Sequence, residues 1–242
     1  MSDVAAGGDG PDLRAEVVDK QIAGTLALVG GAEWQPGCEF DAELLARSGG
    51  TDVVVLPTAA AYEHPERAVA TAKAWFGTLG GHVTGLMVLS HADACQEEYA
   101  AVVRAARYLY LSGGSPLHLR SVLKGSAVFE ALAEAWRGGA VIAGSSAGAM
   151  VLCDPMVDPR GGAYTVGLGL IEQVAIVPHH DGGGAGLLWR TLALAPAGVA
   201  VVGIPERTAL IREPGGGWRT AGQGDVSVFL DGHPGSIGDL QR

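Results

Sequence analysis

The chain has 242 residues, of which 48% are hydrophobic and 17% are charged, and its formal net charge is −10. This length allows one large α/β domain or two small ones, and the composition is that of a globular protein with a substantial core, not of a disordered chain. The excess of acidic residues argues against a nucleic-acid partner, because phosphate binding needs concentrated lysine and arginine.

Residues 1–20 are small and acidic, which predicts a flexible tail and shows neither the basic start nor the apolar stretch of a secretion signal. No apolar run approaches the roughly 18–20 residues of a membrane span. The three cysteines (Cys38, Cys95 and Cys153) have no metal-type spacing, which indicates a reducing compartment. We therefore expect a cytoplasmic protein with no membrane or nucleic-acid partner; its oligomeric state, a homodimer included, is open.

Apolar runs and amphipathic segments alternate along the first 146 residues, punctuated by glycine and proline. Apolar runs without polar alternation are typical of parallel strands that are covered on both faces. The predicted strands fall within 24–34, 51–60, 82–90, 107–114 and 140–146, and the predicted helices within 39–48, 64–81, 96–106 and 126–139.

Beyond residue 160 the pattern changes to short apolar segments separated by glycine and proline, at 174–180, 199–204, 208–213 and 226–230. The whole pattern predicts an α/β fold: a mostly parallel twisted sheet with helices on both faces and an antiparallel or mixed edge toward the C-terminus. No linker or composition break divides residues 21–242, which predicts a single domain there.

The fifth predicted strand runs directly into Gly144-Ser145-Ser146-Ala147-Gly148, which matches the G-x-S-x-G pattern of a nucleophile elbow. The two glycines let strand and helix pack closely while the central serine takes a strained conformation. Ser146 is the predicted nucleophile, and the N–H of Ala147 at the helix start would face an oxyanion. The alternative is a turn that binds nothing or cradles a phosphate.

A nucleophilic serine needs a histidine base. His179 and His180 follow an apolar strand, at the point where a strand delivers a side chain to the edge of a sheet, and one of the pair is the predicted base. With Asp181 the pair also suggests a metal site, but successive side chains on a strand point to opposite faces and converge poorly on one ion. We expect neither a metal nor a cofactor.

Several stretches follow the predicted strands in a familiar order: Val29-Gly30-Gly31, Leu111-Ser112-Gly113-Gly114-Ser115, the elbow, and Gly167-Leu168-Gly169-Leu170 leading to Pro178-His179-His180, with a last stretch at 203–210. Together they resemble the serine peptidase family of cyanophycinase and aspartyl dipeptidase, whose fold is related to class I glutamine amidotransferase domains. The resemblance covers nearly all of residues 24–230. It implies Ser146 as nucleophile and His179 as base, with the N–H groups of Gly114 and Ala147 around the oxyanion.

The family's third catalytic member is an acid between the serine and the histidine in sequence. This chain has Asp154, Asp158 and Glu172 in that interval. We choose Asp158, because it lies in a loop roughly mid-way, and keep Asp154 as second choice. Asp-Pro dipeptides such as those at both aspartates also commonly start turns.

The family's substrate-recognition residues are not matched. Cyanophycinases carry Gln after the Gly-Gly, where this chain has Ser115-Pro116, and several arginines beyond the histidine, where it has glycines and only Arg190. We therefore expect a serine peptidase that cleaves a small peptide or isopeptide other than cyanophycin.

Two other functions remain as alternatives. An α/β-hydrolase esterase shares the elbow, and His233 is the only late histidine it could use. A binding or regulatory protein could keep this fold without chemistry. A glutaminase-type amidotransferase would need cysteine at the elbow, and Cys153 lies seven positions too late.

Overall fold

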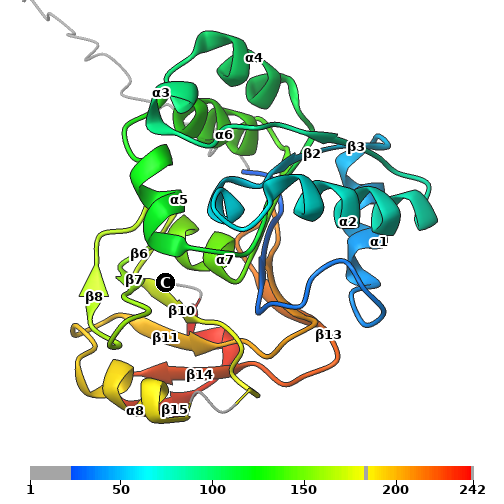
Figure 1. The fold of residues 1–242 in the computed structure, drawn as a ribbon. Helices are drawn as coiled ribbons and strands as arrows, with labels where there is room; N and C mark the ends of the chain where they lie inside the picture. Colours follow the sequence, from blue (N-terminus) through cyan, green and yellow to red (C-terminus); the bar gives the residue numbers. More distant parts are fainter. Residues whose placement is uncertain (1–22, 183–184, 241–242) are drawn as a thin grey trace, which may run out of the picture.

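A seven-stranded sheet crosses the centre of the molecule (Figure 1). The computed structural model describes residues 23–182 and 185–240. The predicted tail at 1–20 lies outside the described residues. In spatial order the sheet contains β13 (Trp218–Gly222), β12 (Thr208–Arg212), β1 (Leu26–Val29), β5 (Val141–Ser145), β4 (Tyr108–Leu111), β2 (Asp52–Leu56) and β3 (His82–Gly85). The last five of these strands, from β1 to β3, are parallel to one another. At the other edge, β12 pairs antiparallel with β1 and β13 pairs antiparallel with β12.

Both faces of this sheet are buried. Leu26 and Leu28 of β1 belong to one apolar core, whereas Ala27 and Val29 point to the opposite face and belong to a second. Two-sided burial explains why the strands read as continuous apolar runs. Helices α1 (Phe40–Ser48) and α2 (Pro65–Thr78) cover the second face, and the first is covered by α3 (His91–Ala94), α4 (Glu97–Ala105), α5 (Pro116–Leu123), α6 (Ala127–Arg137) and α7 (Ala147–Leu152).

The helices predicted from periodicity are confirmed as α1, α2, α4 and α6, whereas α3, α5 and α8 (Ala185–Ala193) were not predicted. A signal for α5 was present, since the Ser115 hydroxyl accepts a hydrogen bond from the N–H of His118 at 3.3 Å and Pro116 takes the first helical position. Short 3₁₀ turns lie at Thr58–Ala60 and Ile237–Leu240. Within the described ranges, no helix has the length and apolar character needed to cross a bilayer.

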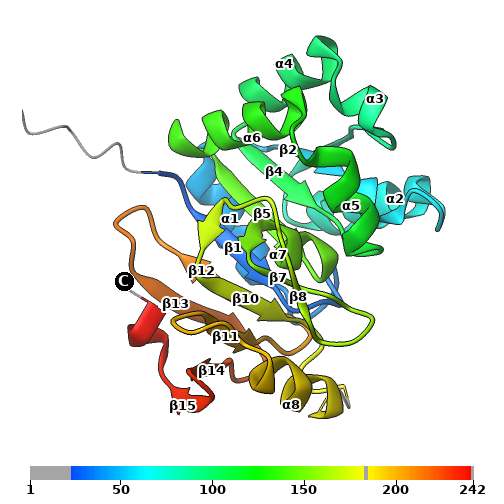
Figure 2. The ribbon, with the colours of Figure 1, turned by 90° about the vertical axis from the view of Figure 1, so that its left-hand side faces the viewer.

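The C-terminal part corrects one expectation. We expected its short strands to extend the edge of a single sheet, but only β12 and β13 do so. Strands β10 (Val174–Val177), β11 (Ala200–Gly203), β14 (Ser227–Leu230) and β15 (His233–Gly235) form a second sheet, in which β10 and β11 are parallel (Figure 2). Its buried valines share the core under α7, so the sheet packs on that face instead of lengthening the first. Two further strand pairs form small sheets of their own: β6 (Cys153–Asp154) with β9 (Ile171–Glu172), and β7 (Met156–Val157) with β8 (Tyr164–Thr165).

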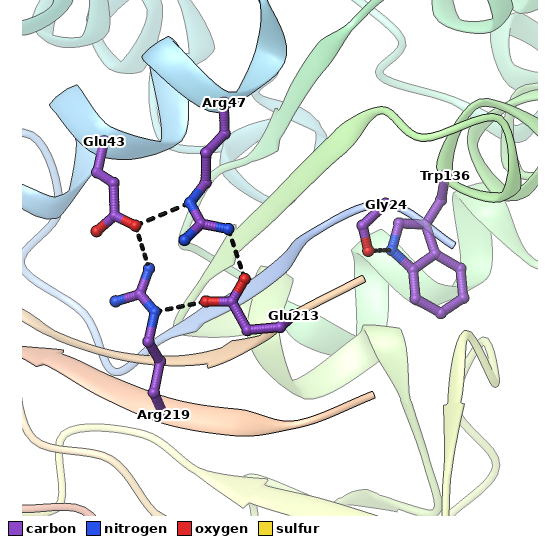
Figure 3. A network of polar contacts seen from close by, with 6 residues as sticks. All are labelled: Gly24, Glu43, Arg47, Trp136, Glu213 and Arg219. Carbon is purple, nitrogen blue, oxygen red and sulfur yellow. Dashed lines mark hydrogen bonds and ion pairs between the residues drawn. The ribbon is translucent and has the colours of Figure 1, made fainter. Parts of the chain in front are cut away.

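A ring of four ion pairs ties α1 to the antiparallel edge of the central sheet (Figure 3). Arg47 and Arg219 each contact both Glu43 and Glu213, at N–O distances of 2.5–2.8 Å. Burial opposes ionisation of Glu213, but hydrogen bonds from the two guanidinium groups outweigh it and lower the pKa of this carboxyl. The network fixes α1 beside β13, although exposed pairs of this kind add little stability each.

Asp41 of α1 is a buried acid beneath the same sheet. Its carboxylate accepts hydrogen bonds from the Trp75 indole of α2 at 2.9 Å and from the Tyr108 hydroxyl of β4 at 3.4 Å. Burial outweighs these two hydrogen bonds and raises the pKa of Asp41 to about 7. The folded state therefore favours the protonated carboxyl at this junction of two helices and a strand.

We predict that Asp41→Asn removes a pH-dependent loss of stability. Asp41 has its ordinary pKa of 3.8 in the unfolded chain, so between that pH and about 7 the folded state holds a proton that the unfolded state has lost. The free energy of unfolding should fall as pH rises through this window, by up to about 1.4 kcal/mol per pH unit. The asparagine variant keeps an acceptor for Trp75 and should lack this decline.

Urea unfolding at pH 5 and pH 7 measures the difference. The exposed Asp52→Asn serves as the matched control and should keep the wild-type dependence. Equal pH dependence in Asp41→Asn and the wild type would contradict the assignment.

Candidate functional site

Ser146 stands on a sharp turn between β5 and α7. Its backbone has φ 48° and ψ −105°, a conformation that residues with a side chain rarely adopt. A methyl group at Gly144 would lie 2.6 Å from the backbone of Gly148, and one at Gly148 would lie 2.4 Å from the carbonyl oxygen of Leu111. Both glycines are therefore required by close packing, as the elbow pattern predicts.

His179 comes from the second sheet, two residues after β10. Its Nε2 lies 2.9 Å from the Ser146 Oγ, and its backbone N–H donates to the carbonyl of Gly30 at the end of β1 (2.8 Å). His180 points elsewhere, since a methyl group at Gly203 of β11 would lie 2.6 Å from the His180 ring. The geometry thus brings His179, and not His180, to the serine.

The acid beside the imidazole is Glu206. Its Oε1 lies 2.8 Å from His179 Nδ1, and its own backbone N–H donates to Asp181 at 3.0 Å. Glu206 follows β11 as His179 follows β10, and these two strands are parallel neighbours with Val177 opposite Gly203. The carboxyl ends of the two strands therefore deliver the acid and the base side by side.

The expected contact between Asp158 and the imidazole is corrected here. The Asp158 carboxylate lies in the turn between β7 and β8 and binds the Arg160 guanidinium at 2.6 and 2.9 Å. Hydrogen bonds from Arg160 lower the pKa of Asp158 to about 2. Of the other two acids, Asp154 accepts the N–H of Gly167 at 2.9 Å and Glu172 is exposed on β9.

The sequence expectation did not include Glu206, because the resemblance implied an acid between the serine and the histidine. The signal that points to it is the stretch 203–210, which already carried part of the resemblance. A parallel pairing of the strands at 174–177 and 200–203 would have placed the residues after both strands at one edge.

The two residues expected as oxyanion donors, Gly114 and Ala147, belong to segments that adjoin Ser146. A methyl group at Gly113 would lie 3.6 Å from the Ser146 Cβ, so the loop after β4 runs beside the nucleophile. Gly114 has φ 134°, and a methyl group there would lie 2.4 Å from the Ala59 carbonyl oxygen. Ala147 is the first residue of α7, a position whose N–H has no acceptor within the helix.

The arrangement is suited to acyl transfer. An imidazole whose Nδ1–H donates to a carboxylate presents an unprotonated Nε2, which accepts the proton of the serine hydroxyl. The side chains of His179 and Glu206 are 45% and 40% exposed, so a substrate can reach them. His233, the base that an esterase would need, lies on β15, and Cys153 lies on β6 beyond the elbow.

The model of peptidase family S51 matches residues 26–216. The chain belongs to this family. It is a serine-type peptidase, as the resemblance implied, and the matched region contains the serine, the histidine and Glu206.

Two relatives of this S51 peptidase are cyanophycinases. The one from Synechococcus elongatus is 28% identical over 218 residues, which cover 85% of this chain and 67% of the relative. The one from Trichormus variabilis is 28% identical over 235 residues, which cover 90% and 78%.

Two solved structures are also similar. A peptidase from an acI-B1 Actinobacterium is 30% identical with a TM-score of 0.78, over 86% of this chain and 91% of the other. A protein described as a peptidase E, from Listeria monocytogenes EGD-e, has a TM-score of 0.65 and 18% identity over 84% and 100% of the two chains, which shows a shared fold.

We predict that Gly31→Ala disables the site of this S51 peptidase without a substitution at the serine or the histidine. Gly31 has φ 130°, and a methyl group there would lie 2.2 Å from Cε1 of the His179 ring. The ring must move, and a displacement near 1 Å costs on the order of 10²-fold in rate. Covalent labelling by a fluorophosphonate, followed over time, measures the loss.

Gly50→Ala is the matched control, because nothing lies within 4 Å of a methyl group at Gly50. Its labelling rate should equal that of the wild type. A wild-type rate in Gly31→Ala would contradict the contact between Gly31 and the imidazole.

Proposed function

We propose that Ser146, His179 and Glu206 act as the catalytic triad of this peptidase. The observation that supports it is the continuous contact from the serine Oγ through the imidazole to the carboxylate, at 2.9 and 2.8 Å. Asp158 is no longer part of the proposed triad, because its carboxylate is engaged by Arg160.

In the proposed reaction, His179 Nε2 removes the hydroxyl proton as Ser146 Oγ attacks the carbonyl carbon of an amide bond. The N–H groups of Gly114 and Ala147 bind the oxygen that becomes negatively charged. The imidazolium, stabilised by the Glu206 carboxylate, then protonates the leaving amine as the C–N bond breaks. Water, deprotonated by His179, attacks the acyl ester and releases the acid and the free serine.

We propose that the substrate is a small peptide or isopeptide other than cyanophycin. We also propose that the fold is of the class I glutamine amidotransferase type. The position where cyanophycinases carry Gln is Ser115, whose hydroxyl caps α5 in this chain. Serine has no side-chain amide like that of glutamine, and its hydroxyl already accepts one hydrogen bond as the helix cap. The expected selectivity therefore differs from that of the cyanophycinase relatives.

Ser146→Ala should abolish hydrolysis, because removing the serine of such a unit generally costs on the order of 10⁶ in turnover. The measurement is cleavage of short peptides with N-terminal Asp, Glu or Gly, with cyanophycin beside them, together with fluorophosphonate labelling. The matched control is Ser121→Ala, whose exposed hydroxyl only contacts its own helix at His118, and it should keep full activity.

Turnover by Ser146→Ala at the wild-type rate would refute the assignment of Ser146 as the nucleophile. Absence of both cleavage and labelling in the wild type would favour a binding protein of the same fold. Cleavage of cyanophycin as fast as the short peptides would refute the proposed substrate class.

Glu206→Gln and Asp158→Asn separate the two acids. Glu206→Gln should lower turnover by on the order of 10³–10⁴-fold, because a neutral amide favours the wrong imidazole tautomer and does not stabilise the imidazolium. Asp158→Asn loses only an exposed ion pair and should stay within about twofold of the wild type. Peptide hydrolysis by both variants at pH 8 decides between them, and the reverse order of the two losses would restore Asp158 as the acid.

A further inference from the structure

Glu33 links three strand-end loops beside the nucleophile. It lies in the loop after β1, four residues beyond Val29. Its Oε1 accepts the backbone N–H of Gly113, in the loop after β4, at 3.0 Å, and its Oε2 accepts the hydroxyl of Ser145, at the end of β5, at 2.7 Å. Both carboxylate oxygens are thus engaged by groups that adjoin the proposed machinery.

Each of these two donors belongs to the residue that precedes a residue of the proposed site. Gly113 precedes Gly114, so the hydrogen bond to the Gly113 N–H fixes the peptide plane next to the one whose N–H is the proposed oxyanion donor. Ser145 is fully buried and precedes Ser146, and its hydroxyl would be unsatisfied without a hydrogen-bond partner. One carboxylate therefore holds both sides of the space into which an oxyanion would fit.

The backbone around Glu33 is held in an unusual conformation. Ala32 has φ 51° and Trp34 has φ 60°, and left-handed residues of this kind cost roughly 1–2 kcal/mol each. The Trp34 ring packs against Tyr110 with centroids 5.0 Å apart, and the carbonyl of Gly31 accepts the N–H of Arg207 at 2.9 Å. These contacts hold the strained loop so that the side chain between them points at the elbow.

We propose that Glu33 is a positioning residue, which fixes the Gly113-Gly114 loop against the elbow so that the oxyanion donors are aligned before substrate binds. The inference rests on the proposed function of Ser146. Glu33 does not exchange protons with the imidazole, whose Nδ1 already faces Glu206. Its contribution is geometric, because preorganised donors need no reorganisation during the reaction.

Two substitutions separate geometry from charge. Glu33→Ala removes both hydrogen bonds. Glu33→Gln keeps both, because the amide oxygen can accept from Gly113 N–H while the amide NH₂ donates to the Ser145 hydroxyl. A positioning role therefore predicts a large effect of alanine and rescue by glutamine.

The probe is a fluorophosphonate, which tests the oxyanion donors without knowledge of the substrate. Ser146 Oγ attacks phosphorus, the P–O bond forms, the P–F bond breaks, fluoride leaves and the proton passes to His179. The phosphonyl oxygen takes the place of the carbonyl oxygen. Glu33→Ala should lower the maximal rate of labelling by about 10–10²-fold, since losing one aligned donor costs on the order of 10²-fold or more.

Three further readouts are specific to positioning. The probe concentration for half-maximal rate should stay the same, because the donors act on the reacting state. The midpoint of the pH profile should also stay the same, because the contact between His179 and Glu206 is untouched. Glu33→Gln should label within about threefold of the wild type.

A folded Glu33→Ala protein that labels at the wild-type rate would overturn the inference and leave the proposed triad intact, provided that Ser146→Ala remains unlabelled. Labelling of Ser146→Ala would instead overturn the proposed function. A Glu33→Gln rate as low as that of Glu33→Ala would overturn the geometric role. If Glu33→Ala does not fold, Ser145→Ala removes one of the two hydrogen bonds, and a wild-type rate in that variant would likewise overturn the inference.

Discussion

The hydrogen bond between Ser146 and His179 joins two sheets that share no strand pairing. The serine follows β5 of the central sheet, and the histidine follows β10 of the second sheet. A contact of 2.9 Å between them requires the two sheets to be placed to within a fraction of an ångström. The shared core under α7 supplies this placement, and the hydrogen bond from the His179 backbone to Gly30 fixes it at the site itself. The site therefore depends on how the sheets pack, and not on one loop.

Backbone strain is concentrated around this junction. Positive φ values occur at Ala32, Trp34, Ser146, His179 and Arg207, and each of these residues carries or adjoins a group of the site. Conformations of this kind cost of order 1–3 kcal/mol each and persist only where neighbouring contacts hold them. Here the holding contacts are backbone hydrogen bonds between strand ends, such as Ser146 to Val29 and Arg207 to Gly31, both at 2.9 Å. These hydrogen bonds hold the strained residues of the proposed site in place.

The two acids near the serine have different surroundings and different proposed roles. Glu206 faces the imidazole and adjoins the site through a parallel strand pair, whereas Glu33 is engaged by Gly113 and Ser145 and makes no contact with the imidazole. Asp158 is held by Arg160 in a separate turn. A carboxylate's neighbours, more than its place in the sequence, decide which step of the proposed chemistry it can serve.

The sequence by itself determined the local features of this protein. Apolar runs with glycine punctuation predicted the five strands and most of the helices up to Ser146, and the elbow and the two strand-end histidines predicted a nucleophile and a base, because each depends on residues close together in the chain. Only the tertiary structure decided that β10 and β11 leave the central sheet, that Glu206 reaches the imidazole, and that Glu33 reaches the elbow from 112 positions away. These contacts join strand ends far apart in sequence, and strand pairing across such distances is set by the packing of the whole core, which no local pattern encodes.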